Sequence, residues 1–210
     1  MIRRIPLFWD LLVEALQTEK RDEIIVKLES PLDRTYPLRT KEDMKTFVLE
    51  INQYVLTLNG ERQMEVFKTL FGSKADTVIA RTRGLYLGPE EVKGCLKVGI
   101  EFGGHSASHP YLPFLSVTQW DKEILGAKAE LESFIGKEVP FFSYPAGKWN
   151  KELRDYLGRS GFQGALATGK RAVGVKEEDL FSLPRISPEG VSAMGKFFSL
   201  VSGVKKEWFE

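Results

Sequence analysis

Short apolar segments alternate with amphipathic helical patterns from residue 85 onward, and this alternation restricts the fold more than any other feature of the sequence. Strands that alternate with helices predict an α/β fold with a mostly parallel sheet or barrel. In such folds the functional site lies at the carboxyl ends of the strands. The expected strands are residues 98–102, 139–144, 162–168 and 180–186, and the expected helices are 116–135, 150–161, one from Pro89 and one from Ser187.

The first 84 residues have a different character, because apolar residues there recur mainly at helical spacing. They predict helices over residues 7–18, 40–58 and 61–71, with a strand or extended arm at 23–29 and a loop at 33–40. Thr40 is expected to cap its helix, and Ser116 and Gln119 form a capping box for the helix that follows them. We therefore expect a helical subdomain at 1–84 and an α/β domain at 85–210.

Composition excludes several classes of protein. The 210 residues include 30 Lys and Arg against 29 Asp and Glu, a balance that argues against nucleic acid or an anionic membrane as partner. Cys95 is the only cysteine, so no disulfide can form within the chain, and a reducing compartment is favoured. No apolar run is long enough to span a membrane, and no signal peptide is recognisable, so we expect a cytoplasmic location.

Both histidines of the chain, His105 and His109, lie four positions apart, directly after the predicted strand at 98–102. Neutral imidazole is the commonest protein ligand for zinc-like metals, and the small residues between the two leave space for an ion. The alternative is a pair of surface histidines beside the turn at Pro110. Pro145-Ala146-Gly147 and the loop after Thr168 also follow predicted strands, so these segments are expected to meet at one edge of the sheet.

Several segments carry a family resemblance. They are His-Ser-Ala-Ser-His-Pro at 105–110, the capped helix after it, Phe-Ser-Tyr-Pro-Ala-Gly at 142–147 and Leu-Pro-Arg-Ile at 183–186. In this order they resemble the polysaccharide deacetylase family, carbohydrate esterase family 4. Pro-Leu-Phe-Trp-Asp at 6–10 is similar to the start of a helical insert found in a long-insertion subgroup of that family. The resemblance implies a partial (β/α) barrel with a helical N-terminal insert.

The resemblance also implies a chemistry, which is metal-dependent removal of acetyl groups from N-acetylated polysaccharides or oligosaccharides. His105 and His109 would bind zinc or another divalent metal. The backbone N–H of Ala146 would stabilise the oxyanion. Tyr144, Pro145 and Trp149 would line the sugar groove, although Trp149 could equally be a packing residue.

The sequence departs from the family pattern in three places. It contains no Asp-Asp pair, which in the family supplies the catalytic base and the third metal ligand. Ser143 stands where many members have arginine, and no histidine follows Ile186. Glu101, Asp121 and Asp179 are candidate replacements for the missing ligand, although Glu101 is equally suited to an exposed position on a strand.

Three hypotheses follow from these matches and departures. The first is a C-terminal portion of a deacetylase-like hydrolase that is inactive alone and self-associates through an exposed sheet edge. The second is a non-catalytic protein of the same fold that binds carbohydrate or a protein partner. The third is an unrelated α/β domain in which the histidine spacing has no function.

Overall fold

The computed structural model describes residues 6–169 and 180–186. These residues fall into two compact units. The first unit holds the chain up to Glu101 and Ala107–Pro110, and the second holds Phe102–Ser106 and the chain from Tyr111 onward. Among the described residues, no helix is both long and apolar enough to cross a membrane. The domain boundary expected at 84 and 85 stays a prediction.

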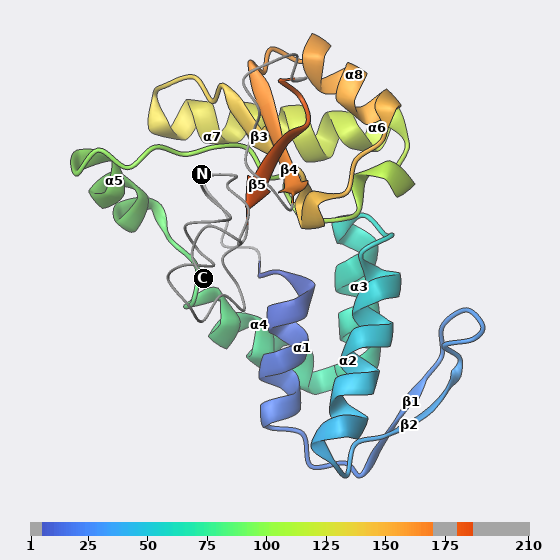
Figure 1. Cartoon of the computed structure of the whole chain (residues 1–210). Coiled ribbons are helices and arrows are strands. Elements are labelled where there is room, and N and C mark those ends of the chain that lie inside the picture. The colour runs from blue at the N-terminus through green and yellow to red at the C-terminus, as the bar shows by residue number, and fades with distance from the viewer. Residues whose placement is uncertain (1–5, 170–179, 187–210) are drawn as a thin grey trace, which may run out of the picture. The chain divides into compact units, whose positions relative to one another are not determined.

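Helices dominate the first unit and confirm most of the expected pattern (Figure 1). The helices are α1 (Phe8–Gln17), α2 (Lys41–Val55), α3 (Gly60–Phe71), η1 (Gly72–Lys74), α4 (Ala75–Arg83) and α5 (Pro89–Lys97). Thr40 caps α2, since its hydroxyl accepts a hydrogen bond from the Asp43 N–H at 3.1 Å while the Asp43 carboxylate accepts one from the Thr40 N–H. The sequence pattern did not predict α4.

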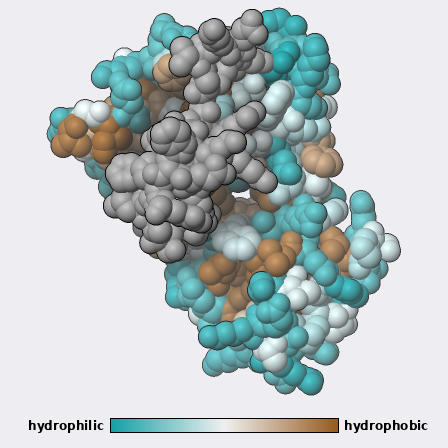
Figure 2. Space-filling model, viewed as in Figure 1, coloured by the Kyte–Doolittle hydropathy of each residue, from teal (hydrophilic) through white to brown (hydrophobic). Residues whose placement is uncertain are grey.

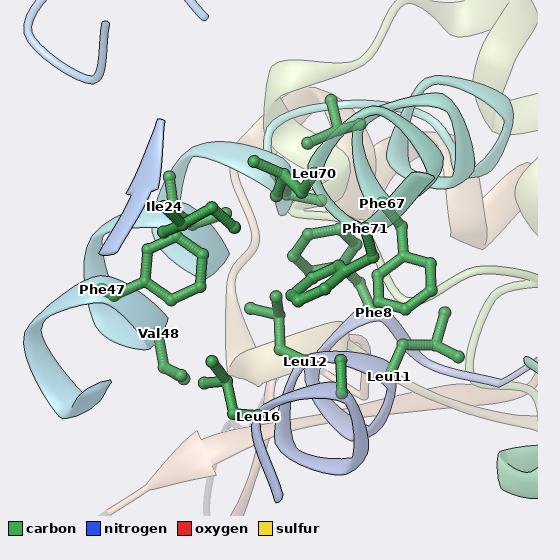
Figure 3. Close-up of a cluster of buried hydrophobic side chains, with 14 of the residues drawn as sticks. Phe8, Leu11, Leu12, Leu16, Ile24, Phe47, Val48, Phe67, Leu70 and Phe71 are labelled. Atoms are coloured by element: carbon green, nitrogen blue, oxygen red, sulfur yellow. The ribbon is translucent and has the colours of Figure 1, made fainter. Parts of the chain in front are cut away.

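One buried cluster holds the first unit together (Figure 3). Phe8, Leu11 and Leu12 of α1 point into it, toward Phe67 and Phe71 of α3. The Phe67 ring meets the edge of the Phe8 ring at 6.2 Å between centroids and lies 5.0 Å from that of Phe71. Removal of these aromatic and aliphatic side chains from water is the main force that stabilises the unit.

The expected loop at residues 33–40 is wrong, because Arg34–Pro37 forms strand β2. It pairs antiparallel with β1 (Glu23–Val26), with Ile24 opposite Tyr36. Tyr36 is buried, its hydroxyl donates to the Glu50 carboxylate at 2.9 Å, and the Arg34 guanidinium stacks on its ring at 4.5 Å. The pairing with β1 and the bonds of Tyr36 and Arg34 to Glu50 of α2 overcome a composition that is typical of a turn.

Glu19 ties the end of α1 to η1, and we expect its replacement by glutamine to destabilise the chain at neutral pH. The buried carboxylate accepts hydrogen bonds from Arg21 at 2.7 Å and Lys74 at 3.2 Å, and from two backbone N–H groups. The Arg21 side chain contributes most to lowering the pKa of Glu19, from 4.5 to about 2. Loss of these charge-assisted bonds is expected to cost about 2 kcal/mol in the free energy of unfolding.

The pH dependence of this loss provides a sharper test. Because the folded pKa is lowered, the stabilisation is fully present above pH 4.5 and is lost as the pH falls toward 2. Urea unfolding of Glu19→Gln and the wild type should therefore differ at pH 7 and converge in acid. Glu42→Gln is the control, since Glu42 forms an exposed pair with Lys45, and its effect should stay within about 0.5 kcal/mol. A pH-independent difference for Glu19→Gln would contradict the assignment.

A parallel sheet forms the centre of the second unit, with the order β3-β4-β5 (Figure 1). The strands are β3 (Phe141–Ser143), β4 (Gly164–Gly169) and β5 (Leu183–Ile186). Phe142 lies opposite Ala165, and Leu166 lies opposite Leu183. The mixed α/β class and the parallel pairing are as expected. Over the described residues, however, the sheet is small and open, and a partial barrel is not shown.

Helices α7 (Ala127–Ile135) and α8 (Lys151–Arg159) pack on the same buried cluster as this sheet (Figure 1). The helix expected over 116–135 forms as α6 (Val117–Trp120), the π-helical turn η3 (Asp121–Gly126) and α7. Gln119 accepts a hydrogen bond from the Ser116 N–H at 2.9 Å, and Gly136 ends the helix in a left-handed conformation. The helix expected from Ser187 lies outside the described residues.

The strand expected at residues 98–102 is wrong. Only Gly104 pairs with the sheet there, through a single parallel bridge to Phe142. Gly99 has φ +82°, which interrupts an extended conformation. Val98 and Ile100 consequently remain 76% and 51% exposed, and Figure 2 shows hydrophobic side chains where the chain leaves α5.

Candidate functional site

His105 is oriented by the end of strand β3. Its Nδ1 lies 2.6 Å from the carbonyl oxygen of Ser143, and Gly104 joins the sheet directly before it. A carbonyl oxygen can only accept a hydrogen bond, so Nδ1 carries the proton in the neutral ring and Nε2 keeps its lone pair. Metal-binding histidines are typically oriented in this way by a backbone carbonyl.

Two residues of the histidine motif have a backbone conformation that is unfavourable for any residue with a Cβ. Ser106 and His109 have φ values of +61° and +60°, in the left-handed region that few residues other than glycine occupy. Such positions concentrate at functional sites, where neighbouring structure holds them. His105 lies in the second unit and His109 in the short segment grouped with the first. The convergence of their two rings on one ion stays a prediction.

The turn at residues 145–147 follows β3 at the same end of the sheet. It forms the short 3-10 turn η4 (Pro145–Gly147), in which Ala146 is exposed and has φ +51°. Gly147 has φ +66°, and a Cβ added to it would lie 2.2 Å from Thr168 Oγ1 and 2.7 Å from the Thr168 backbone nitrogen. The carboxyl end of β4 therefore braces the turn that presents Ala146.

Trp149 presents an apolar surface beside this turn, whereas Tyr144 does not. The Tyr144 side chain is fully buried, and its hydroxyl donates to the Phe181 carbonyl at 2.8 Å. Pro145 is also buried. Trp149 is 39% exposed and stacks on Tyr144, with 6.2 Å between ring centroids. The burial of Tyr144 and Pro145 argues against direct contact of their side chains with a sugar, and Tyr144 supports the Trp149 ring instead.

The third metal ligand is not found among the described residues. Within residues 6–169 and 180–186, no three His, Cys, Asp or Glu side chains gather closely enough to hold a metal ion. Glu101 is exposed, and the Asp121 carboxylate accepts a hydrogen bond from the Tyr156 hydroxyl at 2.6 Å. Burial of Tyr156, together with Asp121, raises the pKa of that hydroxyl. Asp179 lies outside the described residues.

Sequence reasoning missed the two contributions of Ser143. Its carbonyl orients His105, and its hydroxyl is buried without a hydrogen-bond partner in the described part of the chain. A buried hydroxyl without a partner is costly, so the atom marks a position where a polar group of a ligand could bind. The sequence does not indicate which backbone carbonyl will accept such a bond, because every residue has the same backbone carbonyl.

Comparisons with known proteins agree on one family. The sequence profile of the polysaccharide deacetylases matches residues 50–165, just over half of the chain. The Bacillus subtilis protein YxkH, which is named as a polysaccharide deacetylase, is 24% identical over 101 residues. That match covers 48% of this chain and 36% of YxkH, so the chain spans about a third of the length of this relative.

Solved structures of deacetylases give partial matches. A Bacillus anthracis polysaccharide deacetylase has a TM-score of 0.48 at 22% identity, over 55% of this chain and 36% of its own. A Bacillus cereus polysaccharide deacetylase has a TM-score of 0.42 at 25% identity, over 48% and 32%. The Streptococcus pyogenes deacetylase PplD in complex with acetate has a TM-score of 0.45 at 24% identity, over 50% and 49%.

Proposed function

The chain belongs to the polysaccharide deacetylase family, and from this premise we propose that it is the histidine-bearing portion of a metal-dependent carbohydrate deacetylase. The reaction would release acetate from N-acetylated sugars by hydrolysis of a C–N bond that is not a peptide bond. The observation that carries the proposal is the orientation of His105 by the Ser143 carbonyl, which is one of the ways in which proteins orient a metal-binding histidine.

The described residues fit only part of a metal site. His105 and His109 supply two imidazoles, but a catalytic zinc site normally has three protein ligands. A bound divalent ion would polarise a carbonyl and lower the pKa of a bound water. Because the described residues lack a third ligand, we place that ligand outside them, on another part of this chain or on a longer natural protein.

Residues at the carboxyl end of the sheet would serve the substrate. The exposed, left-handed turn at Ala146 would direct a backbone N–H toward the developing oxyanion. Trp149 would pack on the apolar face of a pyranose ring, and the Tyr144 ring stacks against Trp149 and holds it in place. The single bridge at Gly104 supports a further proposal, that the sheet is part of a larger barrel and that this open edge allows self-association.

A non-catalytic function is the second candidate. The 39% exposure of Trp149 favours it, since an accessible aromatic ring would serve carbohydrate binding without hydrolysis. The two candidates share the histidines but differ in their product, since only the enzyme releases acetate.

Zinc binding by the whole chain tests the proposal. We expect His105→Ala and His109→Ala to weaken zinc affinity at least tenfold each, because each removes one ligand of an already short set. Calorimetry of both variants beside the wild type measures this effect, and Asp121→Asn serves as a control that should retain affinity. Zinc affinity that survives loss of both histidines would contradict the proposal.

Acetate release then separates the two candidates. Histidine-dependent zinc binding with acetate release from N-acetylglucosamine oligomers supports the enzyme. The binding protein is supported if zinc and the oligomer bind in a histidine-dependent way but no acetate is released. That outcome should persist when the chain is extended by the remaining part of the family fold.

A further inference from the structure

An exposed aromatic pair lies directly after the histidine motif, and the proposed hydrolysis does not use it. Phe114 is 67% exposed, and its ring lies 6.3 Å from that of the half-buried Tyr111, with 37° between the planes. A large aromatic side chain that remains mostly in water forfeits the free energy of burial. Exposed apolar groups that cluster beside a site often mark a binding surface.

The turn that displays this pair is firmly anchored. It is the 3-10 turn η2 (Leu112–Phe114), in which the Phe114 N–H donates to the Tyr111 carbonyl at 2.9 Å. Leu112 and Leu115 on either side of Phe114 are buried, and the Trp120 indole N–H donates to the Leu112 carbonyl at 2.6 Å. The rings are therefore presented from a fixed backbone, which reduces the entropy lost when a ligand binds.

The same buried cluster supports both this turn and the candidate site. Leu112 and Leu115 belong to the cluster that contains Phe142 and Tyr144. Tyr144 in turn carries the Trp149 ring, and Ser143, between Phe142 and Tyr144, orients His105. The aromatic pair and Trp149 are thus two accessible aromatic surfaces on one core, in the unit that also holds His105.

The chemistry of the surrounding chain favours a neutral, hydroxyl-bearing ligand. No Asp, Glu, Lys or Arg occurs between Phe102 and Trp120, although 28% of the whole chain is charged. Beside Phe114, the exposed hydroxyls of Ser116 and Thr118 lie 3.0 Å apart. A sequence segment that offers aromatic rings and hydroxyls but no charged side chain suits a pyranose ring, which has one apolar C–H face and an edge of hydroxyls.

We propose that Tyr111 and Phe114 form a second sugar-binding surface, which holds a neighbouring unit of the saccharide whose acetylated unit lies at Trp149. This assignment rests on the proposed function and deepens it, because it names the residues that would hold the sugar unit next to the one that is deacetylated. A single N-acetylated sugar would occupy only the surface at Trp149 and would gain nothing from Phe114.

Calorimetry with N-acetylglucosamine and its linear hexamer tests the proposal on the whole chain. The wild type should bind the hexamer more tightly than the monomer. Phe114→Ala and Phe114→Leu should weaken hexamer binding about three- to tenfold, the size expected for one aromatic contact, and should leave monomer binding unchanged. Phe114→Tyr should retain the hexamer affinity, since it keeps the aromatic face.

The control is Phe141→Ala, because Phe141 is 52% exposed at the opposite, amino-terminal end of β3, and it should not affect the hexamer. Equal hexamer affinity for Phe114→Ala and the wild type overturns the second surface, as does a hexamer that binds no better than the monomer. A change in sedimentation without a change in sugar affinity also overturns it, since the pair would then contact a second copy. Histidine-dependent zinc binding, which Phe114→Ala should not alter, tests the proposed function separately.

Discussion

Replacement of Gly147 by alanine is expected to lower the free energy of unfolding by about 2–3 kcal/mol and to displace the turn at Ala146. The added Cβ would overlap Thr168, including its backbone nitrogen at 2.7 Å, which a side-chain rotation cannot relieve. The left-handed φ of +66° adds strain for any residue with a Cβ. Urea unfolding gives the loss of stability, and oligosaccharide binding reports on the displaced turn.

Gly161 provides the matched control for this substitution. Its φ is +72°, but nothing lies within 4 Å of a Cβ built there, so Gly161→Ala should cost only the conformational penalty of about 1 kcal/mol. Adding Thr168→Gly to Gly147→Ala removes the side-chain part of the overlap and should restore part of the stability. Equal losses for Gly147→Ala and Gly161→Ala would show that the bracing by β4 is unimportant.

Replacement of Phe67 by alanine is expected to destabilise the first unit by about 3–5 kcal/mol, because it empties the centre of its core. Phe67 is fully buried and contacts the rings of Phe8 and Phe71 (Figure 3). Chemical unfolding measures the loss, and faster amide exchange in α1 and α3 would locate it. Leu85→Ala is the control, since Leu85 is exposed, and should change stability by no more than about 0.5 kcal/mol. Stability close to that of the wild type for Phe67→Ala would contradict the packing.

Helices were the most predictable part of the fold, because periodicity and capping residues act locally. The apolar spacing in α1 and α2 and the cap at Thr40 can be recognised without knowledge of any distant contact. Helix α4 escaped prediction. It contains Thr77, Val78, Ile79 and Thr82 within nine residues, and such β-branched residues weaken the helical signal. Its buried face against α1 and α3 compensates.

Strands were less predictable, because their existence depends on a partner. Arg34–Pro37 has the composition of a polar loop and becomes a strand through pairing with β1 and contacts with Glu50 of α2. Val98 to Phe102 alternates like a strand but forms none, and the bridge to the sheet comes later, at Gly104. Local pattern cannot report whether a neighbouring strand is present.

The candidate site, like the fold, could be predicted from the sequence only in part. Spacing and residue type indicated His105, His109 and the turn at Ala146, because side-chain chemistry is visible in a sequence. The Ser143 carbonyl that orients His105 and the burial of Tyr144 are properties of the folded backbone and core. Sequence reasoning therefore found candidate ligands but assigned a buried supporting residue to the sugar surface.

The π-helical turn η3 gives the helix from Val117 to Ile135 one more residue in that turn than an α-helix would use. A natural or engineered deletion of one residue within 121–126 could therefore be absorbed without breaking the helix, since it would restore ordinary α-helical geometry. A deletion in the regular α-helical part would instead rotate everything beyond it by about 100°. After a deletion inside the turn, Leu131 and Ile135 would still pack on the buried cluster. A relative whose helix is one residue shorter should therefore be aligned with its gap inside this turn.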